Sequence, residues 1–475
     1  MRRKLAALLL CLSLVFSTYA LSSCAIFAPS MTNPDDPDDP KDPATPPEDP
    51  EAPEEEDPYT PPTSSYDPNS WFNGSTTPSV KPDTDTPAVD PDDEYDQLTF
   101  DAKIAEALKA ALAKIDYCIE SYDGKFPNAY STNNVYKPGQ NKAGWVQGFW
   151  TGVLWQAYEF SGDEKYKTLA STHVDSFYTR IDEKLGTDNH DMGFLYTPSC
   201  VAAYKLTGDE TAKEAALMAA DNLLTRYHAD AGFIQAWGTV GDEAEYRLIV
   251  DCLMNMPILY WASEVSGDSK YADVATRHIA STFETIYREN GSTYHTYYFD
   301  PDTKQPSHGA TKQGYSDEST WSRGQAWAMY GPVLAYTYTE DPACLKYFKA
   351  AADCFISNLP DDYVPYWDFD RSGVDGEPRD TSAAAIAICA ILEACNYLGD
   401  NDPDKARYMT AARNMMEALI DNYFAASIPT ANGLLLGVTQ SRKSNAGVNE
   451  MTPYGDYFFL EAMFRFNDSE WHAYW

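Results

Sequence analysis

The stretch WTGVLWQAYEFSGDEKY, residues 150–166, decides the fold of this chain. Its first half carries a single charge, and apolar residues such as Trp150 and Leu154 recur at helical spacing. Gly162 and Asp163 then separate it from a charged segment. Glycine favours the left-handed conformation that ends a helix, and aspartate caps the next helix. The stretch therefore predicts a buried helix, a tight turn and an amphipathic helix that packs back against it.

The same connector recurs and divides the chain into repeated units. It returns as Thr207-Gly208-Asp209, Ser266-Gly267-Asp268 and Leu398-Gly399-Asp400, and a tyrosine follows in three units, at Tyr166, Tyr271 and Tyr408. Amphipathic stretches near 163–182, 209–228, 268–287, 342–357 and 404–423 alternate with largely apolar ones near 191–206, 248–265, 321–338, 381–397 and 454–466. With helices near 104–115 and 150–158, this gives twelve helices in six hairpins. The pattern predicts an all-α (α/α)6 barrel with the apolar helices inside, while an open solenoid is the alternative.

The N-terminus has the features of an export signal. Arg2-Arg3-Lys4 precedes the apolar run 6–16, and small residues follow, so residues 1–23 form the predicted signal peptide. The run Leu21-Ser22-Ser23-Cys24 resembles a bacterial lipobox, in which Cys24 would carry the lipid. An ordinary cleaved signal with an incidental cysteine is the alternative. We expect an exported bacterial lipoprotein that meets the membrane only through this anchor, at the periplasmic or the outer surface.

A long acidic, proline-rich segment follows the signal. Residues 25–95 hold 17 of the 31 prolines and 19 acidic residues, against only Lys41 and Lys81. Such a segment has too little apolar surface to offset chain entropy, so residues 24–95 are expected to be a disordered linker. The folded domain is then expected over residues 96–475.

The overall charge and the cysteines exclude several classes of protein. A net charge of −37 repels nucleic acid at long range, whereas a local cluster of donors can still capture a short anionic sugar. Neither a P-loop nor a GxSxG or HExxH motif is present. Seven cysteines of the expected domain lack metal-type spacing and are predicted to be buried free thiols, namely Cys118, Cys200, Cys252, Cys344, Cys354, Cys389 and Cys395.

Two aspartates stand at the starts of apolar helices. Asp191 follows His190 at the start of the fourth helix, and Asp251 opens the sixth. Either one can serve as an ordinary helix N-cap. At equivalent points of neighbouring inner helices, however, they would face a shared pocket. Burial and mutual repulsion would favour a shared proton there, whereas the helix N-termini would favour the anions.

Aromatic and donor residues gather near the same helix starts. Trp145, Trp237 and Trp327 are candidates for stacking on sugar faces, whereas the spacing of Trp150 favours the core. Arg323 precedes Trp327 by four residues and shares a helical face with it. Arg323 is either a ligand for an anion or a structural arginine bonded to carbonyl groups.

Six short motifs, each weak alone, occur together in one order. They are Trp145-Val-Gln-Gly-Phe-Trp150, His190-Asp-Met-Gly-Phe194, Asp251-Cys-Leu-Met-Asn255, Arg323-Gly-Gln-Ala-Trp327, Arg379-Asp-Thr-Ser-Ala383 and Gly455-Asp-Tyr-Phe458. In this order they resemble the unsaturated glucuronyl hydrolases, glycoside hydrolase family 88, across about residues 98–467. That family has an (α/α)6 barrel and releases the unsaturated uronic acid left on oligosaccharides by polysaccharide lyases.

The resemblance implies a role for each matched residue. Asp251 would be the general acid and base, and Asp191 the second essential carboxylate. The positions implied to contact the sugar are Trp145, His190, Trp237, His295, Gly309, Thr311, Gln313, Arg323 and Trp327. No metal or organic cofactor is implied, and the expected partner is an unsaturated oligosaccharide.

The chain departs from the family pattern at two places. Lys312 replaces a histidine expected between Thr311 and Gln313, and the late basic loop differs from common members. Some relatives hold a sulfate in that loop with serines and a lysine, so Ser441, Lys443 and Ser444 are candidates for the same task. The alternatives for the whole chain are an unsaturated rhamnogalacturonyl hydrolase and a non-catalytic, glycan-binding surface lipoprotein.

Overall fold

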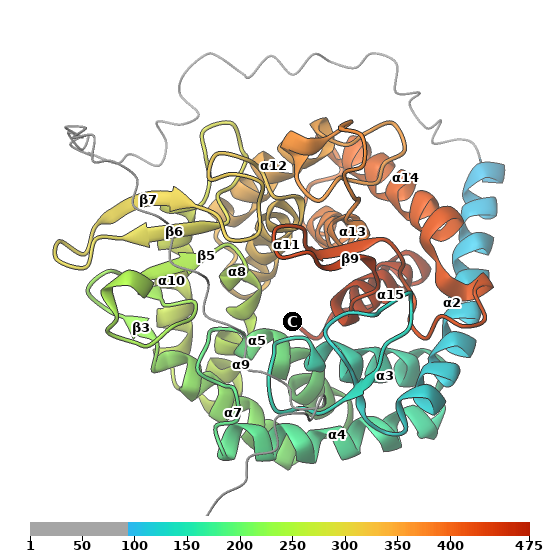
Figure 1. Ribbon diagram of the computed structural model, residues 1–475, viewed down its shortest axis with the longest axis horizontal. Helices are drawn as coiled ribbons and strands as arrows, with labels where there is room; N and C mark the ends of the chain where they lie inside the picture. The colour runs from blue at the N-terminus through green and yellow to red at the C-terminus, as the bar shows by residue number, and fades with distance from the viewer. Residues whose placement is uncertain (1–93) are drawn as a thin grey trace, which may run out of the picture. The chain divides into compact units, whose positions relative to one another are not determined.

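The computed structural model describes residues 94–475, with side chains from residue 97. The expected signal peptide, Cys24 and the linker as far as residue 93 lie outside the described residues. Figure 1 looks down a ring of helices, with the final residues of the chain at its centre.

Twelve helical segments form the ring, as predicted. The outer helices are α2 (Glu94–Tyr122), α4 (Glu164–Asp182), α7 (Glu210–Leu224), α10 (Lys270–Thr285), α12 (Pro342–Ser357) and α14 (Lys405–Tyr423). The inner segments are α3 (Gln147–Ser161), α5 (Met192–Tyr196) with α6 (Ala202–Thr207), α8 (Cys252–Asn255) with α9 (Pro257–Ser266), α11 (Ser322–Thr339), α13 (Thr381–Cys395) and α15 (Pro453–Asn467). The inner helix α15 packs against both α13 and α3, which closes the ring and excludes an open solenoid.

Two inner segments are interrupted, and a proline stands at each interruption. A π-helical turn at Thr197–Val201 separates α5 from α6 and contains Pro198, while Pro257 begins α9 directly after Met256. Proline lacks a backbone N–H and collides with the carbonyl group four residues earlier, so the regular α-helix breaks there.

Glycines allow successive inner helices to approach backbone to backbone. A Cβ atom at Gly148 would collide with the carbonyl oxygens of Phe194 and Leu195, and one at Gly331 would collide with Leu253. The first contact joins α3 to α5 and the second joins α11 to α8. The inner ring is therefore narrow, and its helix starts lie close together.

Three of the four predicted connectors are present and mark one end of the barrel, here called the closed end. The fourth prediction was wrong, because Gly399 is not left-handed and α14 begins only at Lys405, after Asp404. Gly162, Gly208 and Gly267 each adopt a left-handed conformation after an inner helix. Asp163 and Asp209 cap the following outer helices through their side chains. These short turns follow from local sequence alone.

The tyrosines that follow three connectors join neighbouring outer helices. The hydroxyl groups of Tyr166, Tyr271 and Tyr408 each donate a 2.8 Å hydrogen bond to an aspartate on the previous outer helix, namely Asp116, Asp221 and Asp353. The cation directly before each tyrosine lies beside the same aspartate. The repeated tyrosine is therefore a helix-to-helix link.

The opposite end, here called the open end, carries all the longer loops, and these contain strands that the sequence did not predict. The strands are β1 (Phe126–Pro127), β2 (Pro138–Gly139), β3 (Tyr227–His228), β4 (Phe233–Ile234), β5 (Arg247–Ile249), β6 (Thr296–Phe299), β7 (Pro306–Ala310), β8 (Val438–Ser441) and β9 (Ala446–Glu450). The predicted helix over 248–265 was wrong at its start, because residues 247–249 pair with β6. Likewise, the predicted helix over 209–228 ends at Leu224, before β3.

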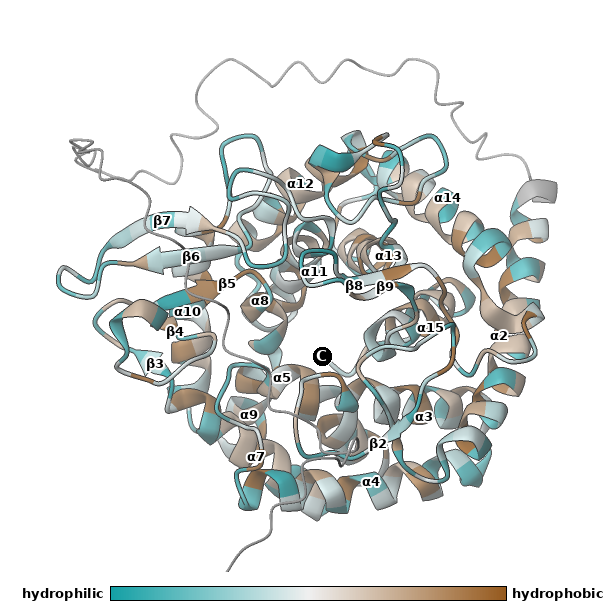
Figure 2. Cartoon of the chain, viewed as in Figure 1, coloured by the Kyte–Doolittle hydropathy of each residue, from teal (hydrophilic) through white to brown (hydrophobic). Residues whose placement is uncertain are grey.

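The core fills the ring between and inside the helices. All seven cysteines of the described chain are buried and free, as predicted, and Trp150 is buried as expected. The Trp475 ring stacks on Phe458 at the centre of the ring, with 5.8 Å between ring centroids. The outer helices mix polar and apolar residues, as Figure 2 shows for α4, α7 and α14. Among residues 94–475, no helix has the length and apolar character that crossing a membrane requires.

Candidate active site

The two predicted aspartates occupy matching places at the open end. Asp191 directly precedes α5 and Asp251 directly precedes α8, so both stand at helix N-cap positions. Neither carboxylate accepts a hydrogen bond from the first turn of its own helix. The ordinary structural explanation, a side-chain cap, therefore does not apply to either residue, and both carboxylates are left for other work.

A glycine and an asparagine hold the two helix starts together. A Cβ atom at Gly193 would lie 2.5 Å from the Cα atom of Asn255 on α8, so only glycine permits this approach. The Asn255 side chain accepts a 2.9 Å hydrogen bond from the Phe194 N–H and donates one of 3.2 Å to the Asp251 carbonyl oxygen. Asn255 therefore bridges the two segments that carry the aspartates.

The surroundings raise the pKa of both carboxyl groups. Burial and then the charge of Asp251 raise the pKa of Asp191 to about 7, against smaller opposing effects of Arg180 and Arg226. Burial also raises the pKa of Asp251 to about 6, while the Arg323 charge opposes this shift. Because repulsion between two carboxylates is reciprocal, the pair retains one proton near neutral pH.

The two carboxyl groups differ in exposure. The Asp191 side chain is 21% exposed, whereas Asp251 is 6% exposed and its Oδ2 atom has no hydrogen-bond partner in the described chain. A buried, unpartnered carboxyl oxygen beside a reachable one is an arrangement that suits proton transfer.

The three-stranded sheet β5-β6-β7 brings distant residues to Asp251. Strand β5 ends two residues before Asp251, and the Val250 N–H donates a 2.9 Å hydrogen bond to the His295 carbonyl oxygen at the start of β6. Strand β7 pairs with β6 through Gly309 and Ala310 and leads into the turn at Lys312. The sheet therefore places His295 and the 309–313 segment beside Asp251.

His295 presents a free N–H group in this setting. Its Nδ1 atom accepts a 2.9 Å hydrogen bond from the Lys312 backbone N–H, so the proton of the neutral ring is assigned to Nε2. Burial lowers the pKa of His295 to about 3, helped by Arg323, Arg247, Lys443 and Lys312. The ring is therefore neutral, and its buried Nε2 atom has no partner in the described chain.

His190 is also neutral and lies against Asp191. Its Nε2 atom is 3.4 Å from Asp191 Oδ1, and the side chain is 1% exposed. Burial holds the pKa of His190 well below its usual range, and His278, Arg226 and His295 act in the same direction. His190 is thus a positioned polar partner of Asp191.

Two of the predicted tryptophans lie partly exposed at the open end. Trp145 stacks on Tyr454 with ring centroids 5.0 Å apart, in the loop just before α3. The Arg247 guanidinium lies 4.4 Å from the Trp237 ring, and that ring is nearly parallel to His295 with centroids 6.4 Å apart. Both tryptophans keep part of their surface free for a ligand.

Arg323 is fully buried and ties loops together. Its Nη1 atom donates to Asp380 and to the Thr439 carbonyl oxygen at 2.8 Å. Its Nη2 atom donates to the Gln440 carbonyl oxygen at 2.7 Å and to Gln313 Oε1 at 3.1 Å. Of the two roles expected from the sequence, Arg323 therefore has the structural one, bonded to carbonyl groups. Its charge also acts on Asp251.

Three other predicted contacts have structural roles in this geometry. Trp327 is fully buried between Phe194 and Phe458, so it supports the site from beneath and does not line its open surface. A Cβ atom at Gly309 would collide with the Tyr294 ring. The Thr311 hydroxyl group accepts a 2.7 Å hydrogen bond from the Gly314 N–H and so closes the turn that contains Lys312.

Sequence reasoning missed four residues that act on the site. Arg180, Arg226 and Arg247 are buried arginines at the ends of outer helices or on β5, and no local motif marks them. Asn255 was part of a quoted motif, and its position four residues after Asp251 was the signal available for it.

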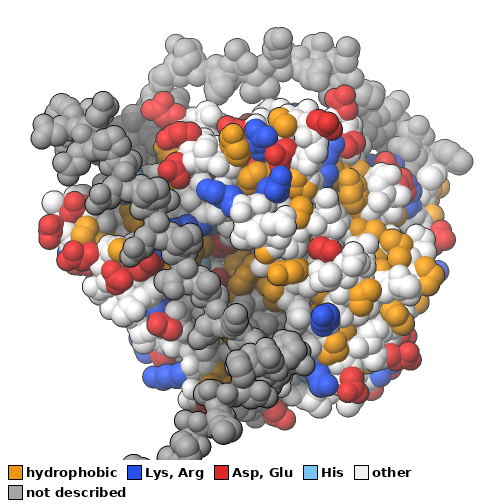
Figure 3. Space-filling view, viewed as in Figure 1, with side chains coloured by type: hydrophobic (Ala, Val, Ile, Leu, Met, Phe, Trp, Pro, Cys, Tyr) orange, Lys and Arg blue, Asp and Glu red, His pale blue; other side chains and the backbone are white. Residues whose placement is uncertain are grey.

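The surroundings of His295 are basic although the protein as a whole is acidic. Four cations, Arg247, Lys312, Arg323 and Lys443, act on His295. In Figure 3 several basic side chains gather on the side of this face above α11 and α12. Within the described residues, no three histidine, cysteine or acidic side chains gather as they do around a metal ion. The arrangement can therefore attract an anion and move a proton beside it.

Comparisons with known proteins identify the family of this chain. The model of Glycosyl Hydrolase Family 88 matches residues 118–465. The unsaturated chondroitin disaccharide hydrolase of Streptococcus agalactiae is 44% identical over 379 residues, which are 80% of this chain and 95% of that protein.

Solved structures give the same result. The crystal structure of an unsaturated glucuronyl hydrolase from Streptococcus agalactiae superposes with a TM-score of 0.77 at 44% identity, covering 79% of this chain and 94% of that one. A mutant of that enzyme complexed with dGlcA-GalNAc6S superposes with a TM-score of 0.71 at 41% identity, with the same two coverages. These matches favour the glucuronyl over the rhamnogalacturonyl interpretation and a hydrolase over a binding protein. The chain belongs to glycoside hydrolase family 88 and is an unsaturated glucuronyl hydrolase by its relatives and its fold.

Proposed function

We propose that this enzyme removes the 4,5-unsaturated uronic acid from the non-reducing end of chondroitin-type disaccharides made by a polysaccharide lyase. The single observation that carries the proposal is the pair Asp191 and Asp251, both at helix starts and neither used as a cap. The 44% identity to an unsaturated chondroitin disaccharide hydrolase supports the substrate class.

In the proposed reaction, the one proton that the coupled pair retains acts first. Asp191 has the higher pKa of the two, so the reactive state is the one in which this shared proton lies on Asp251 and Asp191 is ionised. The C4–C5 double bond of the substrate is conjugated to the ring oxygen, which makes C4 basic. Asp251 delivers its proton to C4, and positive charge develops at C5 and the ring oxygen. The Asp191 carboxylate stabilises that charge at short range in a site of low dielectric.

Water completes the reaction. The ionised Asp251 takes a proton from the water as its oxygen bonds to C5, so Asp251 regains the proton that it gave to C4. The resulting C5 hemiketal opens by breaking the bond from C5 to the ring oxygen. This leaves a hemiacetal at C1, which expels the next sugar. The anomeric carbon is never attacked, so the usual carboxylate separations of retaining and inverting glycosidases do not apply.

The basic surroundings suit the carboxylate of the substrate. The Nε2–H of His295 is a buried donor, and Lys312 supplies positive charge where the family pattern has a histidine. Trp145 and Trp237 offer ring faces to the sugar, and His190 and Asn255 hold Asp191 in place. Gln313 orders the turn through its bond to Arg323.

The test is loss of the ultraviolet absorbance of the unsaturated uronate. Residues 94–475 are mixed with unsaturated disaccharides from chondroitin, hyaluronan, heparin and pectin. We expect loss with the chondroitin products, and about 10³-fold slower loss with Asp251→Asn. Asp400→Asn, an exposed change at the closed end, is the matched control. Wild-type rates in Asp251→Asn would show that Asp251 is not the general acid and base. Turnover of the pectin product alone would show that the substrate is a pectin fragment and not a chondroitin disaccharide.

The strands β8 and β9 carry a second candidate feature, a sulfate contact. The Ser444 hydroxyl donates a 2.7 Å hydrogen bond to Ser441 Oγ, and Lys443 is exposed beside them. We propose that these three residues prefer a sulfated second sugar. Lys443→Ala should lower kcat/KM for the sulfated disaccharide about 10-fold with little effect on the unsulfated one. An unchanged ratio of the two would overturn this preference.

We also propose that the chain is exported and lipid-anchored through Cys24, which lies outside the described residues. The sequence of residues 1–24 supports this location. In cells, the wild-type protein should partition with membranes and Cys24→Ser should appear in the soluble exported fraction. Wild-type protein in the soluble fraction would indicate an ordinary cleaved signal peptide and no lipid anchor at Cys24.

A further inference from the structure

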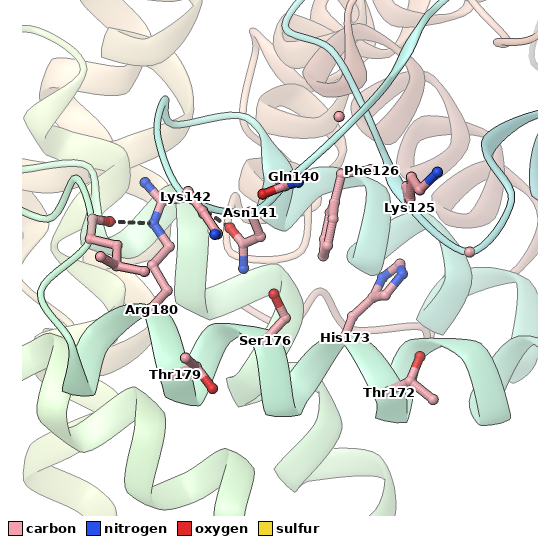
Figure 4. A pocket seen from close by; sticks show the side chains of 13 residues that line it. Lys125, Phe126, Gln140, Asn141, Lys142, Thr172, His173, Ser176, Thr179 and Arg180 are labelled. Carbon is pink, nitrogen blue, oxygen red and sulfur yellow. Dashed lines mark hydrogen bonds between the residues drawn. The ribbon is translucent and has the colours of Figure 1, made fainter.

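A polar cleft lies on the outer wall of the barrel, apart from the paired aspartates. It has a volume of about 370 Å³ and lies between the β1–β2 hairpin with the loop that follows it and one face of α4. Figure 4 shows Lys142 and Asn141 on one wall directed toward Ser176 on the other. We propose that this cleft is a binding site for a small, oxyanion-bearing sugar such as a uronic acid.

A buried amide supplies the clearest sign of a ligand. Asn141 is 4% exposed, and its Oδ1 atom accepts a 2.8 Å hydrogen bond from Arg180 Nη1. This bond fixes the orientation of the amide, so Nδ2 is the atom left over, and it has no partner in the described chain. An unpaired buried donor lowers the stability of the fold unless a hydrogen-bond acceptor reaches it. This donor belongs to a residue that lines an open cleft, where a ligand can supply the acceptor.

The other walls add donors and an apolar surface. Ser176 is half-buried on α4 and lines the cleft with Asn141. The Phe126 ring packs on the His173 ring with centroids 4.2 Å apart. An apolar ring beside fixed polar donors is the usual composition of a sugar site.

The charge of the cleft selects an anion. Its lining contains Lys125, Lys142 and Arg180 but no aspartate or glutamate, in a chain of net charge −37. Lys125 lies 3.6 Å from the exposed Asp123, whereas Lys142 makes no hydrogen bond or ion pair with any described residue. Lys142 is therefore the cation free to meet a carboxylate or a sulfate.

Arg180 connects the cleft to the active site. The same guanidinium that holds Asn141 donates to the Gly144 carbonyl oxygen at 2.6 Å and lies 3.5 Å from Gln147 Oε1. Trp145 stands between these two residues in the chain. A ligand that bonds to Asn141 therefore stiffens the loop that carries Trp145, and Arg180 is a positioning residue for it.

The experiment is calorimetric titration of the folded protein with sodium glucuronate, with glucose and sodium sulfate as separate probes. We expect a glucuronate site that Lys142→Ala and Ser176→Phe weaken at least 10-fold, while Lys184→Ala, an exposed lysine outside the cleft, leaves it unchanged. Glucose should bind at least 10-fold more weakly than glucuronate. Sulfate binding as tight as glucuronate binding would restrict the site to simple oxyanions and so overturn the sugar part.

Unchanged glucuronate binding in both cleft variants, or no binding to the wild type at millimolar concentration, would overturn the proposal. Lys142→Ala changes an exposed side chain, so it tests the site even where Ser176→Phe does not fold. Turnover of the unsaturated disaccharide is measured on the same proteins and should remain at the wild-type rate. Failure of the cleft and failure of the proposed reaction therefore give different results.

Discussion

The two ends of the barrel each contain a buried arginine, and they use it differently. At the open end, Arg323 on α11 bonds to Asp380 and to two backbone carbonyl groups of β8. At the closed end, Arg465 on α15 bonds to Glu393, Glu461 and Tyr330, which are side chains of the inner helices α13, α15 and α11.

The difference lies in what each arginine holds. Arg465 joins three helices whose positions already follow from their apolar faces. Arg323 joins loops that have no such constraint, and its charge also opposes the rise in the pKa of Asp251. A buried arginine therefore stabilises helix packing at the closed end. At the open end, a buried arginine fixes the positions of loops and lowers the proton affinity of Asp251.

Removal of the closed-end arginine should have the largest effect, on stability alone. Arg465→Met leaves the carboxyl groups of Glu393 and Glu461 buried without their cation, so we expect a loss of about 3–5 kcal/mol in the free energy of unfolding. Denaturant unfolding measures it. At 25 °C, the folded fraction should turn over substrate within about 3-fold of the wild type. A shifted pH–rate profile would contradict the division between the ends.

Removal of the open-end arginine should instead change the pH–rate profile. Arg323 favours the ionised form of Asp251, so Arg323→Met should raise the pKa of Asp251 above about 6. The basic limb that depends on protonated Asp251 then moves to higher pH, and kcat falls about 10²-fold as β8 and Gln313 lose their anchor. The profile of kcat against pH checks this. An unmoved limb would mean that Arg323 acts only as a scaffold.

The catalytic carboxyl group should reduce stability above its pKa. The folded-state pKa of Asp251, about 6, is raised above the usual value of 3.8, so folding favours the protonated form. The loss of stability caused by ionising Asp251 in the folded state is absent below about pH 4. It grows between about pH 4 and about pH 6 and is complete above that.

Asp251→Asn should therefore raise the free energy of unfolding at pH 8 by on the order of 2 kcal/mol, and by much less at pH 4. Unfolding by denaturant at both pH values measures it. Asp400→Asn, at the exposed closed-end connector, should give equal stability at both. An equal gain from Asp251→Asn at both pH values would show that its charge is not the cause.

The tyrosine links of the closed end should give the smallest effect. Tyr271→Phe removes a 2.8 Å hydrogen bond to Asp221, and we expect a loss of about 1 kcal/mol in stability with unchanged turnover. Tyr117→Phe, whose ring is exposed on α2, should have no measurable effect. Equal stability of the two variants would show that the hydrogen bond from Tyr271 to Asp221 does not stabilise the closed end.

Most of the fold followed from sequence because its signals are local. The Gly–Asp connectors, the apolar inner stretches and the amphipathic outer ones predicted twelve helices and their order, and the structure has them. The ordered motifs predicted the family. The same local patterns gave Asp191 and Asp251, because each stands directly before an apolar helix.

The tertiary structure alone decided how those residues work. The sheet β5-β6-β7 pairs residues up to 51 positions apart, as Arg247 pairs with Tyr298, and its short strands leave no clear alternation in the sequence. That sheet brings His295 and Lys312 to Asp251. Likewise, whether Arg323 is free and whether Trp327 is exposed depend on carbonyl groups and rings far away in the chain. Helix formation is governed by neighbours along the chain, whereas burial, proton affinity and the convergence of loops are set by residues that only folding brings together.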